Sequence, residues 1–320
     1  MKKYIIALSI LGLLATVSCQ KSSDPTPRVH RLDRVLEKGH MPEDDEKMLD
    51  GIFGYFYICG YGEPSDAGIY VFNSMPQIMP YRQAVDTTFT DFTAEAEGVE
   101  RVLENFSKEV DKVNPPHAFT VINPYPEPVL VMDSLVFIGL SHYLGADSPL
   151  YSDYPDYMKA RKVRERIPAD VAETMARVFY QHVPETGVTP TVISEMLYEG
   201  AITEAIMQMA GVSEAFAIGM PEESVKWIDD NEARIWEKMV NEGLVTSIDP
   251  DVARGLIGYT PAARIIHPEA PGMIGKVIGH RIVKSYLEAN PSVTWSKLLE
   301  PTFFENPNTL ERSGYNPGKK

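Results

Sequence analysis

Residues 117–140 have the sequence HAFTVINPYPEPVLVMDSLVFIGL, in which the spacing of apolar residues changes from that of the rest of the chain. It holds three short apolar runs, at 117–122, 129–132 and 134–140. β-Branched and aromatic residues are frequent in these runs, which favours strands. A proline-rich turn at 123–128 separates the first two runs. The stretch therefore predicts one small β-sheet.

Helical spacing dominates on both sides of this stretch. Before it, apolar residues recur at three- and four-residue steps, which predicts a helix over 94–113. After Pro168 the same spacing, interrupted by Gly or Pro, predicts five more helices. They cover 168–182, 190–210, 221–242, 249–256 and 271–289. The predicted fold class is α+β and helix-dominated, with a small sheet packed on a helical bundle.

The composition excludes several classes of protein. The 320-residue chain has 45 Asp and Glu against 30 Lys and Arg, a formal net charge of −15, and no evident basic stripe. Such a chain is a poor candidate for binding nucleic acid. With 23% charged residues and a mean hydropathy of −0.18, it is neither a mostly disordered nor a multi-span membrane protein. Two cysteines exclude a disulfide framework.

The N-terminus predicts export and lipidation. A basic start at Lys2 and Lys3 precedes an apolar run at 5–15, which is too short to span a bilayer and is typical of a signal peptide over 1–18. The following LATVSC resembles a bacterial lipobox, in which Cys19 would be acylated and become the first residue. Residues 19–28 would then be a lipidated tether, and 29–320 a single domain. The alternative is an ordinary signal peptide with an incidental cysteine.

Motifs for metal or nucleophilic chemistry are missing from the sequence. None of the seven histidines has the pairing of a metal-binding helix, and no nucleophile elbow or phosphate loop occurs. We therefore predict no metal and no cofactor. Ser141 and His142 are adjacent, and chain neighbours rarely form a catalytic pair, so we interpret them as turn residues. Cys59 is interpreted as a small buried residue, because no basic neighbour would activate it.

Glu199 is the most informative carboxylate. At helical spacing it shares the apolar face of 190–210 with Met196 and Thr203. A buried carboxylate needs hydrogen-bond or charge partners, or its pKa rises. Glu199 is therefore either a ligand or acid–base group, or a structural carboxylate paired with a helix cap or an arginine. Glu195 lies on the flank of the same face.

The last long helix carries several glycines. Gly272, Gly275 and Gly279 fall within eight positions, and each costs roughly 1 kcal/mol relative to Ala in a helix. Close approach of another backbone is the simplest compensation. His280 projects beside the apolar stripe, either into a cleft or as a core histidine with satisfied hydrogen bonds.

Several segments together resemble the gliding-motility GldB lipoproteins of Bacteroidetes. These segments are IGLSHYLG (138–145), YPDY (154–157), RIPAD (166–170), MLYEG (196–200), NEARIW (231–236), PGMIGKVIG (271–279) and IVKSY (282–286). The resemblance implies a lipid-anchored envelope protein of the gliding machinery, with envelope protein partners. The residue after Cys19 is Gln20 and not Asp, which is compatible with sorting to the outer membrane.

The GldB family itself resembles zincin metallopeptidases that have lost their metal site. By this resemblance Ala172 and Ala176 stand where zincins have zinc-binding histidines, and only Glu173 of that signature remains. Glu199 or Glu195 would match the glutamate of the second helix. The resemblance implies a zincin-like, peptidase-like cleft reused for binding, with His142, Glu195, Glu199 and His280 as candidate residues.

Three functions follow as hypotheses. The first is a non-catalytic scaffold or binding protein anchored in the outer membrane through Cys19. The second is a divergent zincin-like hydrolase of peptides or cell-wall fragments, with Glu173 or Glu199 as base and His280 as a residual candidate. The third is a polysaccharide-binding module using some of the 16 tyrosines.

Overall fold

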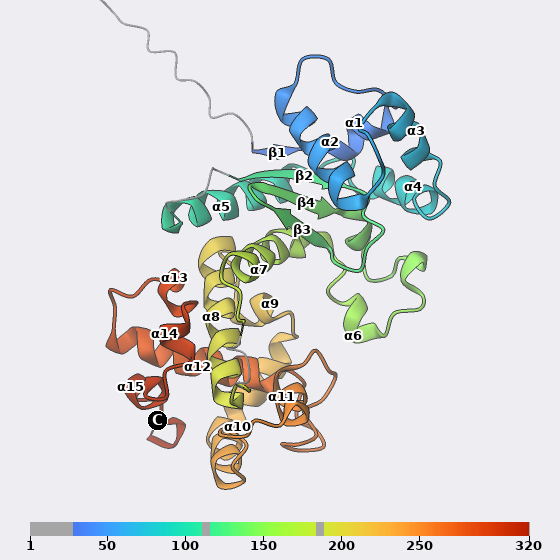
Figure 1. The fold of residues 1–320 in the computed structure, drawn as a ribbon. Helices are drawn as coiled ribbons and strands as arrows, with labels where there is room; N and C mark the ends of the chain where they lie inside the picture. The colour runs from blue at the N-terminus through green and yellow to red at the C-terminus, as the bar shows by residue number, and fades with distance from the viewer. Residues whose placement is uncertain (1–27, 111–115, 184–188, 320) are drawn as a thin grey trace, which may run out of the picture.

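A four-stranded mixed sheet lies in the N-terminal half of the chain (Figure 1). The computed structural model describes residues 28–110, 116–183 and 189–319. Strand order is β1-β2-β4-β3, with β2 parallel to both β1 and β4, and β3 antiparallel to β4. The strand bounds are β1 Val29–His30, β2 His117–Val121, β3 Val129–Met132 and β4 Leu135–Gly139. The three predicted strands are confirmed as β2, β3 and β4.

Helices make up most of the remaining described chain. Their bounds are α1 Leu32–Glu37, α2 Glu46–Cys59, α3 Asp66–Asn73, α4 Met79–Thr88, α5 Thr93–Glu109, α6 Asp156–Lys159, α7 Ile167–Phe179, α8 Val192–Ala210, α9 Glu214–Ile218, α10 Glu222–Asn241, α11 Pro250–Ile257, α12 Ile274–Ala289, α13 Trp295–Leu298, α14 Pro301–Phe304 and α15 Thr309–Ser313. The six predicted helices are confirmed as α5, α7, α8, α10, α11 and α12. The helix-dominated α+β class is therefore correct.

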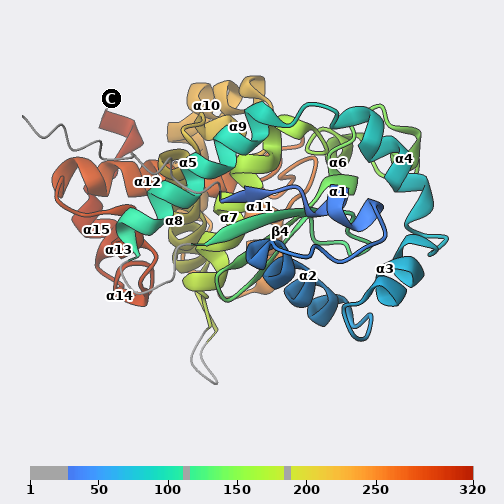
Figure 2. The same cartoon turned by 90° about the horizontal axis from the view of Figure 1, so that it is seen from above.

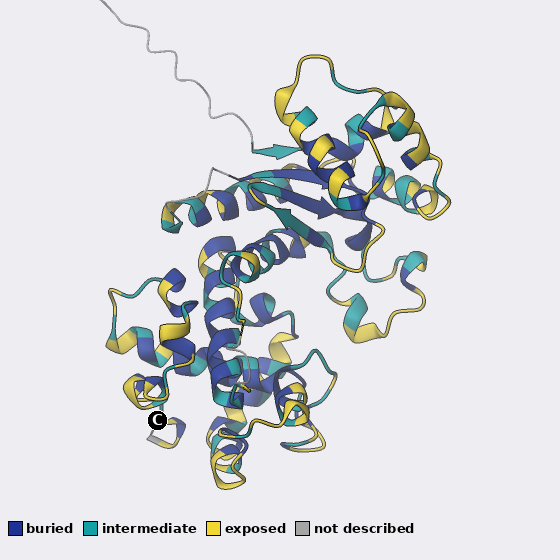
Figure 3. Ribbon diagram, in the orientation of Figure 1, coloured by how far each residue is buried: buried dark blue, intermediate teal, exposed yellow. Residues whose placement is uncertain are grey.

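Helices cover the sheet in layers. The helix α2 packs on one face, where Gly51 and Gly54 leave room for the rings of Phe119 on β2 and Phe137 on β4. The helices α5 and α7 lie on the opposite side in Figure 1, and α8 and α12 follow beyond α7. Strands β2 and β4 and helices α7, α8 and α12 are the most continuously buried elements (Figure 3). Helices α2–α4 and α13–α15 lie at opposite ends of the molecule (Figure 2).

The central helix α8 crosses α12 at two glycines. Thr191 caps α8 by accepting a hydrogen bond from the Ser194 amide, and Gly211 ends it in the left-handed conformation. At the crossing, a Cβ added to Gly200 would lie 2.6 Å from the His280 amide nitrogen, and one added to Gly279 would lie 2.7 Å from the Met196 carbonyl carbon. The predicted close approach of another backbone is therefore confirmed for Gly279.

Cys59 lies at the end of α2 with 7% of its surface exposed, and burial raises the pKa of its thiol to about 11. It is a buried cysteine, as the sequence indicates, and its raised pKa disfavours the reactive thiolate. The predicted signal peptide, Cys19 and the tether up to residue 27 lie outside the described residues. Among the residues that are described, no helix combines the length and apolar content that crossing a bilayer needs.

Candidate functional site

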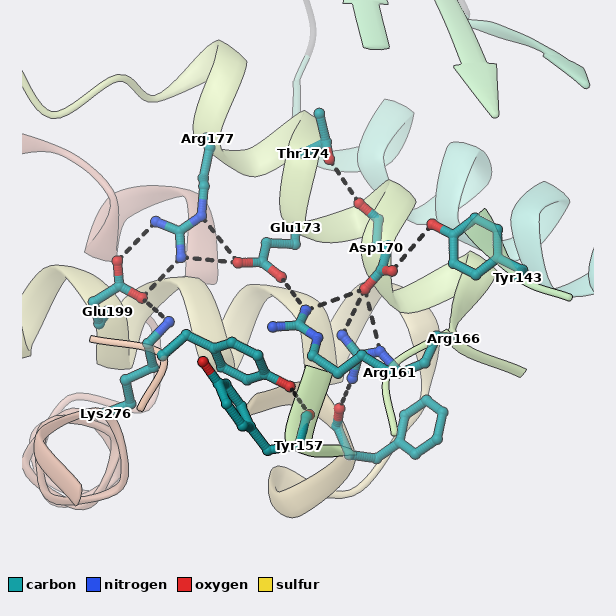
Figure 4. Close-up of polar contacts among 12 residues, drawn as sticks. Tyr143, Tyr157, Arg161, Arg166, Asp170, Glu173, Thr174, Arg177, Glu199 and Lys276 are labelled. Atoms are coloured by element: carbon teal, nitrogen blue, oxygen red, sulfur yellow. Dashed lines mark hydrogen bonds and ion pairs between the residues drawn. The ribbon is translucent and has the colours of Figure 1, made fainter. Parts of the chain in front are cut away.

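The facing sides of α7 and α8 carry a group of charged residues. On α7, Asp170, Glu173 and Arg177 follow one another at three- and four-residue steps, which places them on one face of the helix. Other elements bring further charges to this face, and we call the whole set the ion-pair chain. Its members are Arg161, Arg166, Asp170, Glu173, Arg177, Glu199 and Lys276 (Figure 4).

Arg177 joins the carboxylates of two helices. Its Nη1 donates to Glu199 Oε1 at 2.8 Å, its Nη2 to Glu199 Oε2 at 2.8 Å, and its Nε to Glu173 Oε1 at 3.1 Å. Lys276 on α12 adds a second cation, with Nζ 2.8 Å from Glu199 Oε2. Such a two-pronged guanidinium–carboxylate contact fixes both orientation and charge. The result is a continuous link from α7 through α8 to α12.

The other end of the chain centres on Asp170. Arg166 donates to Asp170 Oδ1 from Nη2 at 2.6 Å, and Arg161 lies between Asp170 at 3.4 Å and Glu173 at 3.2 Å. The Tyr143 hydroxyl donates to Asp170 Oδ2 at 3.0 Å. Only 2% of the Arg166 side chain is exposed, and its Nη1 donates a hydrogen bond to the Phe216 carbonyl oxygen. Every buried carboxylate oxygen of Asp170 therefore has a partner.

This environment keeps the two glutamates ionised. Burial alone would raise the pKa of Glu199, but Lys276 and Arg177 outweigh it and lower the pKa to about 2. Burial would likewise raise the pKa of Glu173. The positive charges of Arg177 and Arg161 outweigh this effect and hold the pKa well below its usual range. Both carboxylates are permanently negative at neutral pH, and both are engaged by cations.

Two cavities meet at Arg177. The first cavity, of about 580 Å³, lies between the end of α7 and the start of α8. It is lined by Arg177, Gln181, His182, Val183, Pro190, Glu195, Tyr198 and Glu199. The second cavity, of about 330 Å³, lies between α7 and the segments that follow β2, β4 and α6. It is lined by Pro126, Pro128, His142, Tyr143, Met158, Arg161, Lys162, Asp170, Glu173, Thr174, Arg177 and Tyr259.

The structure brings most of the predicted site residues to these cavities. Glu199 and Glu195 line the first cavity, while Glu173 and His142 line the second. Glu173 and Glu199 meet through Arg177, so the arginine partner considered for Glu199 is present. Burial raises the pKa of Glu195, in contrast to Glu199 one turn later.

His280 is placed differently from the expectation of a cleft residue. It lines neither cavity and is only 2% exposed, in the interior between α8, α9 and α12. Its Nε2 lies 2.9 Å from Glu204 Oε2, and its Nδ1 contacts Glu214. Burial would lower the pKa of His280, but these two hydrogen bonds outweigh it and raise the pKa. The physical reason is that two carboxylates from neighbouring helices satisfy both ring nitrogens, as for a core histidine.

Ala172 and Ala176, which the sequence resemblance aligns with zincin zinc ligands, cannot bind a metal ion through their side chains. Ala172 and Ala176 are fully buried and have no donor atom on their side chains. Glu173 and Glu199 already bind cationic side chains. Within the described ranges, no group of three or more His, Cys, Asp or Glu residues is arranged to hold a metal.

Sequence reasoning missed the cations of the ion-pair chain. Arg177 carries a local signal, because it follows Glu173 by four residues, the spacing at which opposite charges pair on a helix. Lys276 and Arg161 carry none, since they reach the carboxylates only after α12 and the α6 segment pack against α7 and α8.

A family model described as gliding motility protein GldB (GldB_lipo) matches residues 24–317. The chain belongs to the GldB family. No curated protein and no solved structure matches it. Membership associates the chain with gliding motility, and it confirms the family resemblance seen in the sequence.

Four of the seven GldB-like segments of the sequence meet at the ion-pair chain. Segment 166–170 supplies Arg166 and Asp170, segment 196–200 supplies Glu199, and segment 271–279 supplies Lys276. The segment that follows β4 supplies Tyr143. Segments far apart in the sequence thus build one site, and this site is the candidate functional region.

Proposed function

We propose that this protein is a lipoprotein of the cell envelope, anchored in the outer membrane by acyl chains on Cys19. It would serve the gliding-motility or envelope machinery as a non-catalytic binding component. The lipobox-like LATVSC and the match to a gliding-motility family support the anchor and the setting. Two or three acyl chains give durable membrane attachment, because each buried methylene contributes about 0.8 kcal/mol.

The state of Glu173 and Glu199 carries the non-catalytic part of the proposal. A general base must accept a proton, and it works best when its pKa lies near the working pH. The arginine and lysine partners hold the pKa of both glutamates far below that range. Ala172 and Ala176 also lack atoms that could bind a catalytic metal. This arrangement supports a cleft that binds rather than cleaves, within the zincin-like body that the sequence resemblance implies.

Complementation with Glu173→Gln tests the absence of catalysis. Glutamine keeps the shape of the side chain, and Arg161 and Arg177 retain Asp170 and Glu199 as partners. In a strain lacking the gene, we expect the variant to restore surface spreading and envelope integrity to the wild-type level when both proteins are equally abundant. A folded, abundant variant that restores neither would favour the hydrolase.

Metabolic labelling with a clickable palmitate analogue tests the anchor. The chain has two cysteines, so Cys59→Ala is a matched control for Cys19→Ala. We expect Cys19→Ala to lose the label and leave the outer-membrane fraction, and Cys59→Ala to keep both. Equal labelling of the two variants would refute lipidation at Cys19.

A further inference from the structure

Lys162 brings an uncompensated charge to the second cavity. Its ammonium lies over the rings of Tyr151 and Tyr154, with 4.9 Å and 4.4 Å from Nζ to the two ring centroids. The Tyr151 ring is fixed in turn, because its hydroxyl donates to the Ser141 carbonyl oxygen at 2.6 Å and accepts from the Leu144 amide. Lys162 is therefore held at the cavity by cation–π contacts.

The other cations of this region all have carboxylate partners. Arg161 and Arg177 each contact two carboxylates of the ion-pair chain. Within the described residues, by contrast, no carboxylate oxygen lies within 4.0 Å of Lys162 Nζ. The cavity walls hold three cations against Asp170 and Glu173. Of these three cations, Lys162 is the one without an ion-pair partner among the described residues, in a chain whose formal net charge is −15.

His142 adds a second unsatisfied group to the same wall. The residue is 9% exposed, and its Nε2 has no hydrogen-bond partner in the part of the chain that the structure describes. Burial and the nearby Lys162 lower the pKa of His142 to about 4, so the ring is neutral at physiological pH. A neutral imidazole can donate or accept one hydrogen bond at this nitrogen, directly or through a water. The wall therefore offers one charge and one polar ring to a ligand.

We infer that the second cavity binds the terminal carboxylate of a peptide with an apolar last residue, with Lys162 as its counter-ion. The inference rests on the proposed function, in which the cleft binds rather than cleaves. The cavity has room for one such residue beside Met158, Tyr259 and two prolines, at about 330 Å³. A carboxylate fits better than a phosphate, because the single positive charge of Lys162 matches one negative charge, whereas a phosphate carries about −1.5 to −2 at pH 7 and both arginines here are already engaged.

Fluorescence polarisation with labelled pentapeptides tests the inference on the full-length protein in detergent. One peptide ends in a free Leu carboxylate, and its partner ends in Leu amide. We expect the free acid to bind roughly 10- to 100-fold more tightly, the range of a charge-assisted hydrogen bond. Lys162→Gln should abolish this difference, and Lys162→Arg should restore most of it. Lys159→Gln is the matched control, since Lys159 lies three residues away and does not line the cavity.

Further arms identify the source of the carboxylate. A peptide ending in D-Ala that binds more tightly than its L-Ala counterpart would assign the site to cell-wall peptides, and the reverse would assign it to protein C-termini. Equal binding of acid and amide, or of wild type and Lys162→Gln, would refute the inference. So would displacement of the peptide by inorganic phosphate at a lower concentration than by acetate. None of these results affects palmitate labelling or Glu173→Gln complementation, so the two proposals fail separately.

Discussion

Replacing Gly279 by Ala should destabilise the protein through the crossing of α8 and α12. The new Cβ would lie 2.7 Å from the Met196 carbonyl carbon, whereas ordinary contacts of a Cβ begin at 3.4 Å. The helices must therefore separate by about 0.7 Å or more, which disturbs a close-packed interior. Overpacking of this kind costs typically 1–3 kcal/mol and occasionally more, and clash with rigid backbone favours the upper end. Ala also has a higher helix propensity than Gly, which offsets about 1 kcal/mol of this destabilisation.

We therefore expect a net loss of about 2 kcal/mol, or a fall in Tm of roughly 3 °C, since the unfolding entropy of about 2.1 cal/mol/K per residue amounts to about 0.7 kcal/mol/K for a chain of this size. Differential scanning fluorimetry and urea unfolding measure it. Gly255→Ala is the matched control, because Gly255 lies within α11 and its added Cβ would meet nothing closer than Ile265, at 3.7 Å. That variant should be unchanged or slightly more stable. If Gly279→Ala melts at the wild-type temperature, the reasoning about the crossing is wrong.

Three further predictions concern single side chains. Arg177→Met should lower the free energy of unfolding in urea by about 3 kcal/mol, since two carboxylates lose their shared cation while Arg161 and Lys276 remain; a loss below 1 kcal/mol would contradict this. The pKa of His280 is raised in the folded protein. Protonated His280 therefore stabilises the fold fully below about pH 6.5, the pKa of a histidine in the unfolded chain, and this stabilisation is lost as the pH rises through the folded-state pKa. The Tm difference between wild type and His280→Gln should accordingly be largest near pH 6 and shrink on titration to pH 9, and a pH-independent difference would count against the pairing. Cys59, with its pKa of about 11, should resist iodoacetamide at pH 8 in folded protein and react after denaturation.

Local patterns predicted the central elements well. The helix α8 was predicted from apolar spacing, and its capping Thr191 and final Gly211 are both visible in the sequence. The helix α2 is not among the predicted helices. Its signals were nevertheless present, with Asp45 accepting from the Met48 amide at the start and Gly60 in the left-handed conformation at the end.

Strand β1 had no local signal. It contains two residues, and its conformation depends on pairing of Val29 with Ala118 and of His30 with Phe119. These partners lie about ninety positions later in the chain, so only the folded sheet defines the strand. Contacts between distant segments of this kind cannot be predicted from periodicity.

The sequence pointed to the carboxylates of the candidate site, but it did not point to the cations that pair with them. The position of Glu199 on an apolar face required a charged or hydrogen-bonding partner, and the structure supplies Arg177 and Lys276. His280 had equally ambiguous spacing, and its two glutamate partners come from other helices. Nothing local distinguishes Lys162 from Lys159. The two lysines differ only after folding, when Lys162 lies over the rings of Tyr151 and Tyr154.

Arg177 lines both cavities, while its guanidinium is held by one carboxylate of α7 and one of α8. A residue in this position belongs to two walls at the same time. Any substitution that changes its size or charge therefore reshapes both cavities together, so neither can be altered here independently of the other.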